Sequence, residues 1–526
     1  MKKKLICLMV AGVLPAVAVA DTTSDEIKTL EKQLQALQRE VKQLRAGQMA
    51  AGTGKNAGAA DAGPAVAAPA SVDASSPDYG SARAQLTNDE VDQMKQQISN
   101  QQLKVDALTD AATTGPIAGL SVTGYLDPTY IYNRGLGSAS FLFANHASEY
   151  QYYNSTFGDL YLDIKKTFGV GPLAPSAEVT LMPNRGYGVS LLNEHNSTAS
   201  DILNTAVITV PFSMTTSVVA GLMPSFGGYE VQQSTQMLTL THNLLYDFSD
   251  PGAYVGVGLN YMGEGSNWAW KFMLGNEQFH TSGSQIQTGA NALGDPVTTS
   301  NRVPTFTARV DYTWSGALDI GGSFNIGRQT LIQGVDSNGN PLPVYGAGGK
   351  ASSPFGTFFF SEADMTYQTA DMQYNAELDY GQQGNAAYNG GTAQWYGLSL
   401  LANRKFHVPG LGRMGVTARY DVLADQKNGG GASSILLNGN GMDPYNGFGI
   451  GASCLAASKA NGGYGFECKG SVRQDVAFDL LFYPTQQLTI KMEYRHDWST
   501  HDTFLRSDGS YAKSNDLFGT QLIYAF

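Results

Sequence analysis

The sequence predicts an all-β transmembrane antiparallel β-barrel of about 16 strands, with 18 as the alternative, preceded by a periplasmic α-helical coiled-coil segment. Three observations lead to this fold class. Segments from residue 119 onward alternate apolar and polar side chains, as strands with two different faces do. No run of 18 apolar residues follows the N-terminus, which excludes a spanning helix. Residues 514–526 form an alternating strand that ends on Phe526, as the closing strand of a barrel would.

The first 20 residues have the features of a signal peptide. Three lysines at 2–4 precede an apolar run, and the small residues Ala18 and Ala20 suit cleavage. Cleavage would leave 30 Lys and Arg residues against 45 Asp and Glu residues, a formal net charge of −15. An acidic chain without basic clusters argues against nucleic acid as a partner.

Two heptad patterns predict helices at 21–49 and 86–111, because apolar residues lie alternately three and four positions apart, as in coiled coils. The positions are Ile27, Leu30, Leu34, Leu37, Val41 and Leu44 in the first, and Val91, Met94, Ile98, Gln101, Val105 and Leu108 in the second. Residues 50–85 are rich in Ala, Gly and Pro and are expected to form a flexible linker. We expect the helices to join a homo-oligomer. Pairing within one chain, or a single amphipathic helix lying on the barrel, are the alternatives.

The barrel is predicted at 119–526, where charged residues are confined to one face of successive strands. In one such strand, Tyr374 and Leu378 alternate with Glu377 and Asp379. A soluble sandwich would bury an apolar face and expose a polar one. Charges on the same face of many strands instead indicate a wet lumen inside a barrel whose outer face is apolar.

The loop lengths identify one segment that does not fit the wall. Seventeen segments are strand-like, but a barrel whose two ends lie on one side of the membrane needs an even number. The alternation of long and short connections slips once, near 236–248. If this segment is not a wall strand, residues 224–252 become one long loop and the count is sixteen. A missed strand within 279–302 would give eighteen. We prefer sixteen, with 224–252 folded into the lumen as a candidate constriction loop.

Function in such a barrel depends on the side chains that point into the lumen. The pore-lining candidates are Asp159, Asp163, Lys165, Glu178, Glu230, Arg309, Asp311, Glu362, Asp364, Glu377, Asp379, Arg419, Asp421, Arg473, Asp475, Lys491, Glu493 and Arg495. Acidic residues outnumber basic ones in this set by twelve to six, which predicts a weak preference for cations. Many of these charges are expected to pair across neighbouring strands, so that only a few line a constriction.

Other chemistry has little support in the sequence. The run that contains His496 and His501 resembles a metal site, but the strand register points His496 outward beside an aromatic residue. No metal, cofactor or catalytic residue is therefore predicted. Two cysteines follow the signal peptide, Cys454 and Cys468, and an exported chain favours a disulfide bond between them. Such a bridge is expected to staple a loop and not a core.

The last strand carries a further expectation. Gly519, Leu522, Tyr524 and Phe526 resemble the terminal signal that outer-membrane assembly machinery reads. This predicts the assembly machinery and outer-membrane lipid as partners. It also predicts that deletion of Phe526 impairs insertion more than it alters conductance.

Three stretches are similar to a known family: V-T-G-Y-L-D-P-T-Y at 122–130, G-L-M-P-S-F-G-G-Y-E at 221–230 and W-A-W-K-F-M-L-G-N-E at 268–277. They resemble OmpL-like β-barrel porins, and the whole chain resembles a porin-like outer-membrane protein family of β-proteobacteria. The resemblance implies passive diffusion of small hydrophilic solutes across the outer membrane of a Gram-negative cell, with the N-terminal helices in the periplasm. It also implies an inward-folded loop, which would match 224–252. The heptad helices are similar to those of some trimeric sugar-specific porins, which favours a trimer.

Two other functions stay open beside the diffusion porin, and none of the three is enzymatic. One is a substrate-specific channel for sugars or organic acids. The other is a structural or adhesive barrel whose helices tether periplasmic partners. Single-channel conductance would separate these three functions.

Overall fold

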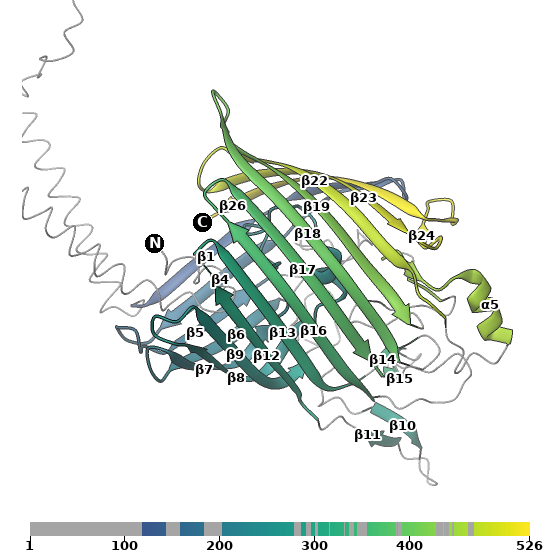
Figure 1. Cartoon of the computed structure of the whole chain (residues 1–526), viewed down its shortest axis with the longest axis horizontal. Helices are drawn as coiled ribbons and strands as arrows, with labels where there is room; N and C mark the ends of the chain where they lie inside the picture. The colour runs from purple at the N-terminus through teal and green to yellow at the C-terminus, as the bar shows by residue number, and fades with distance from the viewer. Residues whose placement is uncertain are drawn as a thin grey trace, which may run out of the picture. The chain divides into compact units, whose positions relative to one another are not determined.

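The structure is a computed structural model, shown in Figure 1. It describes residues 118–143, 158–182, 202–277, 286–290, 296–299, 303–314, 316–330, 332–335, 341–343, 355–384, 387, 392–427, 435, 441–443, 446–460 and 468–526. The predicted signal peptide, both heptad segments and the linker lie outside these residues.

Sixteen strand positions form a closed antiparallel barrel. Their order around the wall is β1 (Leu120–Leu126) with β2 (Thr129–Asn133), β4 (Leu160–Thr167), β5 (Ser176–Leu181), β6 (Leu203–Pro211), β7 (Thr216–Pro224), β8 (Ala253–Met262), β9 (Trp268–Glu277), β12 (Thr305–Thr313), β13 (Leu318–Thr330), β16 (Phe355–Gln368), β17 (Met372–Gln383), β18 (Ala393–Val408), β19 (Gly412–Lys427), β22 (Val472–Tyr483), β23 (Leu488–Ser499) and β26 (Ser514–Ala525). Each position pairs with the next, and β26 returns to pair with β1 and β2, which closes the ring. The preferred count of sixteen is confirmed.

Smaller elements lie outside this wall order, in stretches that the sequence predicted as loops. β3 (Ser138–Leu142) pairs with β2. The remaining elements are the hairpins β10 (Ile286–Ala290) with β11 (Pro296–Thr299), β14 (Ile332–Val335) with β15 (Pro341–Pro343), β20 (Met442–Asp443) with β21 (Phe448–Gly449) and β24 (Phe504–Leu505) with β25 (Tyr511–Ala512), and the helices α4 (Leu244–Phe248) and α5 (Ala452–Ala460).

The first wall position is divided, although the sequence predicted one strand there. Asp127 and Pro128 separate β1 from β2. Pro128 has no backbone N–H and cannot donate to a ladder. Its carbonyl still accepts a hydrogen bond from the N–H of Leu522 at 3.1 Å. Because β26 pairs with both β1 and β2, it spans the interruption and keeps the wall closed.

The two faces of the wall differ as the alternation predicts. On β17 the side chain of Leu378 is 57% exposed, whereas its neighbours Glu377 and Asp379 are 1% and 5% exposed. Large apolar side chains are exposed on the outer face of many other strands, among them Val257 and Phe478. Such an extensive exposed apolar surface is unusual for a soluble monomer. Among the described helices, none has the length and apolar character needed to cross a bilayer.

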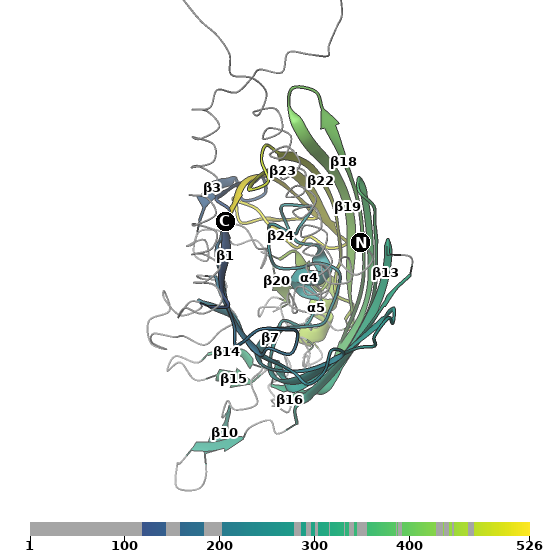
Figure 2. The same ribbon diagram turned by 90° about the vertical axis from the view of Figure 1, so that its left-hand side faces the viewer.

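The chain between β7 and β8 enters the barrel and returns, and Figure 2 shows α4 within the ring of strands. We call residues 225–252 the lumen segment. Pro224, predicted as the first residue of this loop, pairs with Ala253 and ends β7. Residues 236–248 contain turns and α4 and contribute no strand to the wall, which agrees with the preferred interpretation.

Candidate functional site

The lumen segment first contacts the wall through Phe226. This ring packs into an apolar cluster on the inner face of β7, β8 and β9 that contains Val219, Met223, Tyr254 and Met273. The ammonium of Lys271 on β9 lies 5.7 Å from the centre of the Phe226 ring, within cation–π distance. The first turn of the segment is therefore held on the β7–β9 side.

The far end of the segment, α4, packs on the opposite side of the lumen. Leu244, Leu245 and Phe248 are fully buried in an apolar cluster with side chains from β16, β18 and β19. Asn243 caps the helix, since its Oδ1 accepts a hydrogen bond from the N–H of Tyr246 at 2.6 Å. A five-residue helix is too short to be stable alone, so packing against the wall must hold it.

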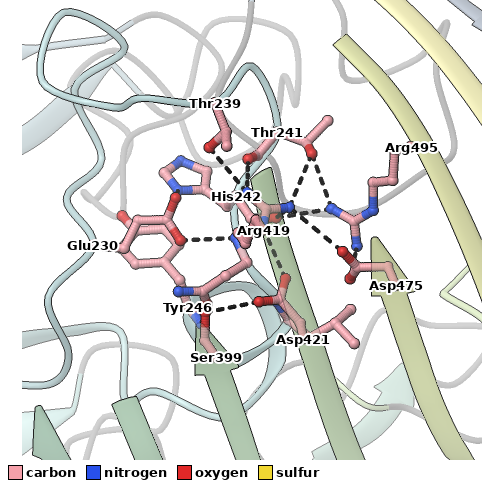
Figure 3. A network of polar contacts seen from close by, with 12 residues as sticks. Glu230, Thr239, Thr241, His242, Tyr246, Ser399, Arg419, Asp421, Asp475 and Arg495 are labelled. Carbon is pink, nitrogen blue, oxygen red and sulfur yellow. Dashed lines mark hydrogen bonds and ion pairs between the residues drawn. The ribbon is translucent and has the colours of Figure 1, made fainter. Parts of the chain in front are cut away.

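Two arginines of the wall bind the middle of the lumen segment, as Figure 3 shows. Arg419 on β19 donates to Thr239 Oγ1 at 2.9 Å and to the carbonyl of His242 at 2.8 Å. Arg495 on β23 donates to Thr241 Oγ1 at 2.9 Å and to the same His242 carbonyl at 2.8 Å. The charge of Arg419 is balanced by Asp421, at 2.9 Å from its Nε. The two arginines thus supply hydrogen-bond donors to backbone carbonyls that are buried away from water.

An acidic residue and a lysine of β23 complete this attachment. Glu493 Oε2 accepts hydrogen bonds from the backbone N–H groups of Leu240 and Thr241 at 2.8 and 3.0 Å. Lys491 donates to the carbonyls of Ser234 and Thr239, both at 2.8 Å. Backbone N–H groups of the lumen segment therefore bind a carboxylate, and its backbone carbonyls bind cations. These contacts supply the hydrogen bonds that a buried backbone without regular secondary structure needs.

Burial makes these contacts energetically significant. The side chains of Arg419, Asp421, Asp475 and Arg495 are fully buried. Removing one partner of a buried, hydrogen-bonded ion pair typically costs about 3–5 kcal/mol, because the other charge is left without compensation. We infer that this part of the wall fixes the position of the lumen segment.

A second charged group lies on β12, β16 and β17. Arg309 contacts three carboxylates, Asp311 at 2.7 Å, Glu362 at 2.8 Å and Asp364 at 2.6 Å. It also donates to the carbonyl of Phe226 at 3.0 Å. Acidic residues thus outnumber the single arginine in this group. Arg309 nevertheless binds the start of the lumen segment through the Phe226 carbonyl.

The charges on β4 and β5 are placed differently. Lys165 and Glu178 pair across the two strands at 3.1 Å, and their side chains remain 14% and 22% exposed. Asp163 is also half-buried. Among the described residues, no hydrogen bond or ion pair connects these three side chains to the lumen segment. The lumen segment contacts β4 and β1 through two tyrosine hydroxyls: Gln233 donates to Tyr161 at 3.4 Å, and the N–H of Ser234 donates to Tyr125 at 3.3 Å.

A family model described as "Protein of unknown function (DUF3138)" matches residues 1–526. The chain belongs to the DUF3138 family. No curated protein matches it.

Several solved structures have barrels similar to that of this DUF3138 chain. They include OmpT, an outer membrane protein of Vibrio cholerae, in a trimer form; the outer membrane channel DcaP of Acinetobacter baumannii; and an anion-selective porin from Comamonas acidovorans. Sequence identities are 10%, 12% and 10%, and TM-scores are 0.42, 0.42 and 0.44. Each match covers 77% of this chain and 99%, 97% and 99% of the other. The porin-like architecture itself follows from the strand pairings of this chain.

The eighteen predicted pore-lining candidates fall into three groups in the DUF3138 barrel. Those on or against the lumen segment are Glu230, Arg419, Asp421, Arg473, Asp475, Lys491, Glu493 and Arg495. Those around Arg309 are Asp311, Glu362, Asp364, Glu377 and Asp379. Those on the β4–β5 side are Asp159, Asp163, Lys165 and Glu178, of which Asp159 is fully buried next to Asp127.

Sequence reasoning missed several residues of these groups. Asp497 pairs with Arg473 at 2.8 Å, and Lys271 lies 4.0 Å from Asp311. Both occupy inward positions of alternating strands, so the same pattern could have found them. Asp127 lies on the polar face of the predicted first strand but is not among the pore-lining candidates, and Asp250 adjoins a proline between strands, where no alternation marks it.

Cys454 and Cys468 form a disulfide bond with a Cα–Cα distance of 5.8 Å. The bridge was expected to staple a loop away from any core. Cys468 is instead buried in the same apolar cluster as Phe248 and Phe448, and Cys454 packs against that cluster. The bridged region therefore adjoins the end of the lumen segment.

The residues of the predicted assembly signal divide between the two faces of β26. Leu522, Tyr524 and Phe526 are exposed on the outer face. Gly519 lies on the inner face, where a Cβ atom would come within 2.8 Å of Leu240 on the lumen segment. This glycine therefore makes room for the segment, whatever its role in assembly.

Proposed function

We propose that this protein is an outer-membrane porin through which small hydrophilic solutes diffuse passively, with the lumen segment as its constriction. One observation carries the proposal: a closed barrel with an apolar outer face holds a long connection against its inner wall through buried charges. An apolar outer face suits lipid, and a polar inner face suits water. We also propose, as the sequence resemblance implies, that the protein is related to OmpL-like porins.

The passage for solutes is proposed to follow the β4–β5 side of the lumen. The lumen segment contacts the inner wall at β7–β9, β12, β16–β19, β22, β23 and β26, and it contacts β1 and β4 through the hydroxyls of Tyr125 and Tyr161. Lys165 and Glu178 retain exposed surface on the remaining side. Solutes would therefore meet these side chains, together with Asp163, before the buried charges of the other strands.

A weak preference for cations is part of the proposal. Acidic residues outnumber basic ones on the inner wall, and a charged lumen wall raises the local concentration of ions of opposite sign. Most of the basic residues are committed to buried pairs. The half-buried Asp163 and Glu178 then outnumber Lys165 along the proposed passage.

The N-terminal region is proposed to act outside the barrel. Residues 21–49 and 86–111 would form coiled-coil helices in the periplasm and support a homo-oligomer, with a trimer preferred. Cross-linking of the full chain and of a chain without 21–111 tests this: equal oligomer content in both would contradict it.

Conductance in planar bilayers tests the proposed channel. A variant suited to the test replaces 225–252 with a short glycine-containing turn, because Pro224 and Ala253 are already paired and can form a hairpin. We expect steady conductance from the whole chain and a larger conductance from the variant. The absence of current from both would contradict the diffusion channel, and equal currents would contradict the constriction. Block by one sugar or organic acid would indicate a substrate-specific channel instead.

A further inference from the structure

Three carboxylates meet where the lumen segment returns to the wall. Asp250 lies near the end of the segment, and Glu377 and Asp379 lie two residues apart on the inner face of β17. One oxygen from each of the three lies within 4.8 Å of the others. All three side chains are buried, and Asp250 is 6% exposed.

Two of these carboxylates, Asp250 and Asp379, differ from the other buried acids of the described residues in that both of their oxygens lack a partner of good hydrogen-bond geometry. Both oxygens of Asp250, both of Asp379 and Oε1 of Glu377 are buried without a partner of good hydrogen-bond geometry among the described residues, and Asp379 lies close to Ser249 and to Asp250 itself. The other oxygen of Glu377 accepts a hydrogen bond from the N–H of Tyr229 at 3.3 Å. None of the three forms an ion pair with a described lysine or arginine, and Arg309 close by already contacts three other carboxylates.

The backbone of the lumen segment closes this cluster on one side. A Cβ atom on Gly228 would lie 2.7 Å from Glu377 Oε1 and 2.9 Å from Asp250 Oδ2. Gly228 also has φ = +63°, a conformation that glycine adopts without strain. The backbone therefore lies directly against two of the three carboxylates, and burial of carboxylates without a compensating charge is costly.

We propose that Asp250, Glu377 and Asp379 bind a divalent cation, Ca²⁺, which fastens the end of the lumen segment to β17. Carboxylate oxygens are the ligands that this hard cation prefers. Ca²⁺–oxygen distances of about 2.3–2.6 Å allow ligand oxygens to lie up to roughly 5 Å apart, which fits the 4.8 Å limit. The set contains no sulfur or imidazole, the ligands typical of Zn²⁺.

Terbium luminescence tests the site directly, because Tb³⁺ replaces Ca²⁺ and is excited through a nearby tryptophan. Trp395 is fully buried, and its indole N–H donates to Oγ of Ser249, the residue before Asp250, at 3.1 Å. The other four tryptophans lie on the outer face or at the wall rim. We expect the whole chain, purified in detergent with EGTA, to give sensitised Tb³⁺ emission that Ca²⁺ displaces. When the excitation is selective for tryptophan over tyrosine, Trp395→Phe should lose the emission while Ca²⁺ still raises the melting temperature.

Isosteric variants decide whether the carboxylates are the ligands. Asp250→Asn combined with Asp379→Asn should weaken Ca²⁺ binding by about tenfold or more, because affinity follows ligand charge. The melting temperature in EGTA should not fall, since the variant also removes repulsion. Asp319→Asn is the matched control: Asp319 is a buried inward aspartate on β13 with one unpartnered oxygen, outside the cluster.

Two results would overturn the proposal. One is Tb³⁺ emission and a Ca²⁺-induced melting shift that persist in the double variant. The other is a whole chain that neither binds Tb³⁺ nor responds to Ca²⁺, in which case protons neutralise the cluster. Both readouts measure binding without any current, so they are independent of the proposed channel activity.

Discussion

Inward-facing charges on β22 and β23 are shielded from water, whereas those on β4 and β5 keep part of their surface exposed. Arg495 and Asp475 have fully buried side chains, while Lys165 and Glu178 remain partly exposed. The strands themselves are alike, because all alternate charged and apolar residues. What differs is the lumen segment, which covers one side of the inner wall with hydrogen-bonded contacts and leaves the other side less covered.

This difference shows that a charge on the inner wall can have either of two uses. Covered charges compensate the polar backbone of the lumen segment, and their value is structural. Partly exposed charges can act on passing solutes. The alternating pattern alone does not distinguish the two uses, so the comparison between the two sides needs direct tests.

The largest expected effect comes from the covered side. Arg419→Met removes hydrogen bonds to Thr239 and His242 and leaves Asp421 without the arginine that balances its charge. We expect a loss of about 3–5 kcal/mol in the free energy of unfolding, measured by urea denaturation in detergent or lipid. Lys165→Met on β4 is the control and should cost clearly less, because its partner keeps contact with water. Equal losses would mean that the two sides do not differ.

A smaller effect is expected from Gly397 on β18. A Cβ atom there would lie 2.8 Å from Cδ1 of Leu245 on the lumen segment and 3.0 Å from the carbonyl oxygen of Val422. Gly397→Ala should therefore lower the free energy of unfolding by about 1–3 kcal/mol through overpacking. Gly415→Ala on β19 is a suitable control, because the nearest atom lies at 3.4 Å and belongs to a side chain. A tolerated Gly397→Ala would contradict close packing of α4 against β18.

Ion selectivity should respond to the exposed side. Asp163→Asn combined with Glu178→Gln removes two negative charges along the proposed passage and leaves Lys165 unpaired. We expect the reversal potential under a salt gradient to shift toward anion preference, and to shift more at low ionic strength, where screening is weaker. Asp319→Asn, which removes a buried inward charge on β13 away from β4 and β5, serves as the control. If the control shifts the potential as much, solutes do not follow the β4–β5 side.

The smallest expected effect concerns pH. Burial, together with the neighbouring Asp364 and Glu230, raises the pKa of Asp250, which lies outside the strands, to about 7. Protons should therefore compete with Ca²⁺, and the Ca²⁺-induced melting shift should decline as pH falls through about 7. Without Ca²⁺ the sign reverses: the folded state binds more protons than the unfolded state, so stability should decline as pH rises from about 4 to 7. Asp250→Asn should reduce both trends, and a pH response that is unchanged in this variant would assign them to other groups.

The sequence predicted the wall better than its contents. Alternation identified the two faces, and the interruption in loop lengths identified 236–248 as a segment outside the wall. The break at Pro128 could have been anticipated, because proline has no backbone N–H to donate. The barrel stays closed there because β26 pairs with the strands on both sides of the break. The path of the lumen segment could not be predicted, because it depends on contacts with strands more than 200 positions later, such as Leu240 with Glu493. For the same reason Arg495 and Lys165 look equivalent in the sequence.

The contacts of the lumen segment also impose an order of events during folding. Ser234 and Leu240 are bound by Lys491 and Glu493, and Leu240 packs against Gly519 on the closing strand. Such distant contacts carry a high entropic cost of loop closure and form late. The segment, though translated early, can reach its final place only when the last strands are present. Closure of the barrel by β26 and placement of the lumen segment are therefore expected in one cooperative step. A chain whose last strands fail to pair would also leave its lumen segment out of place.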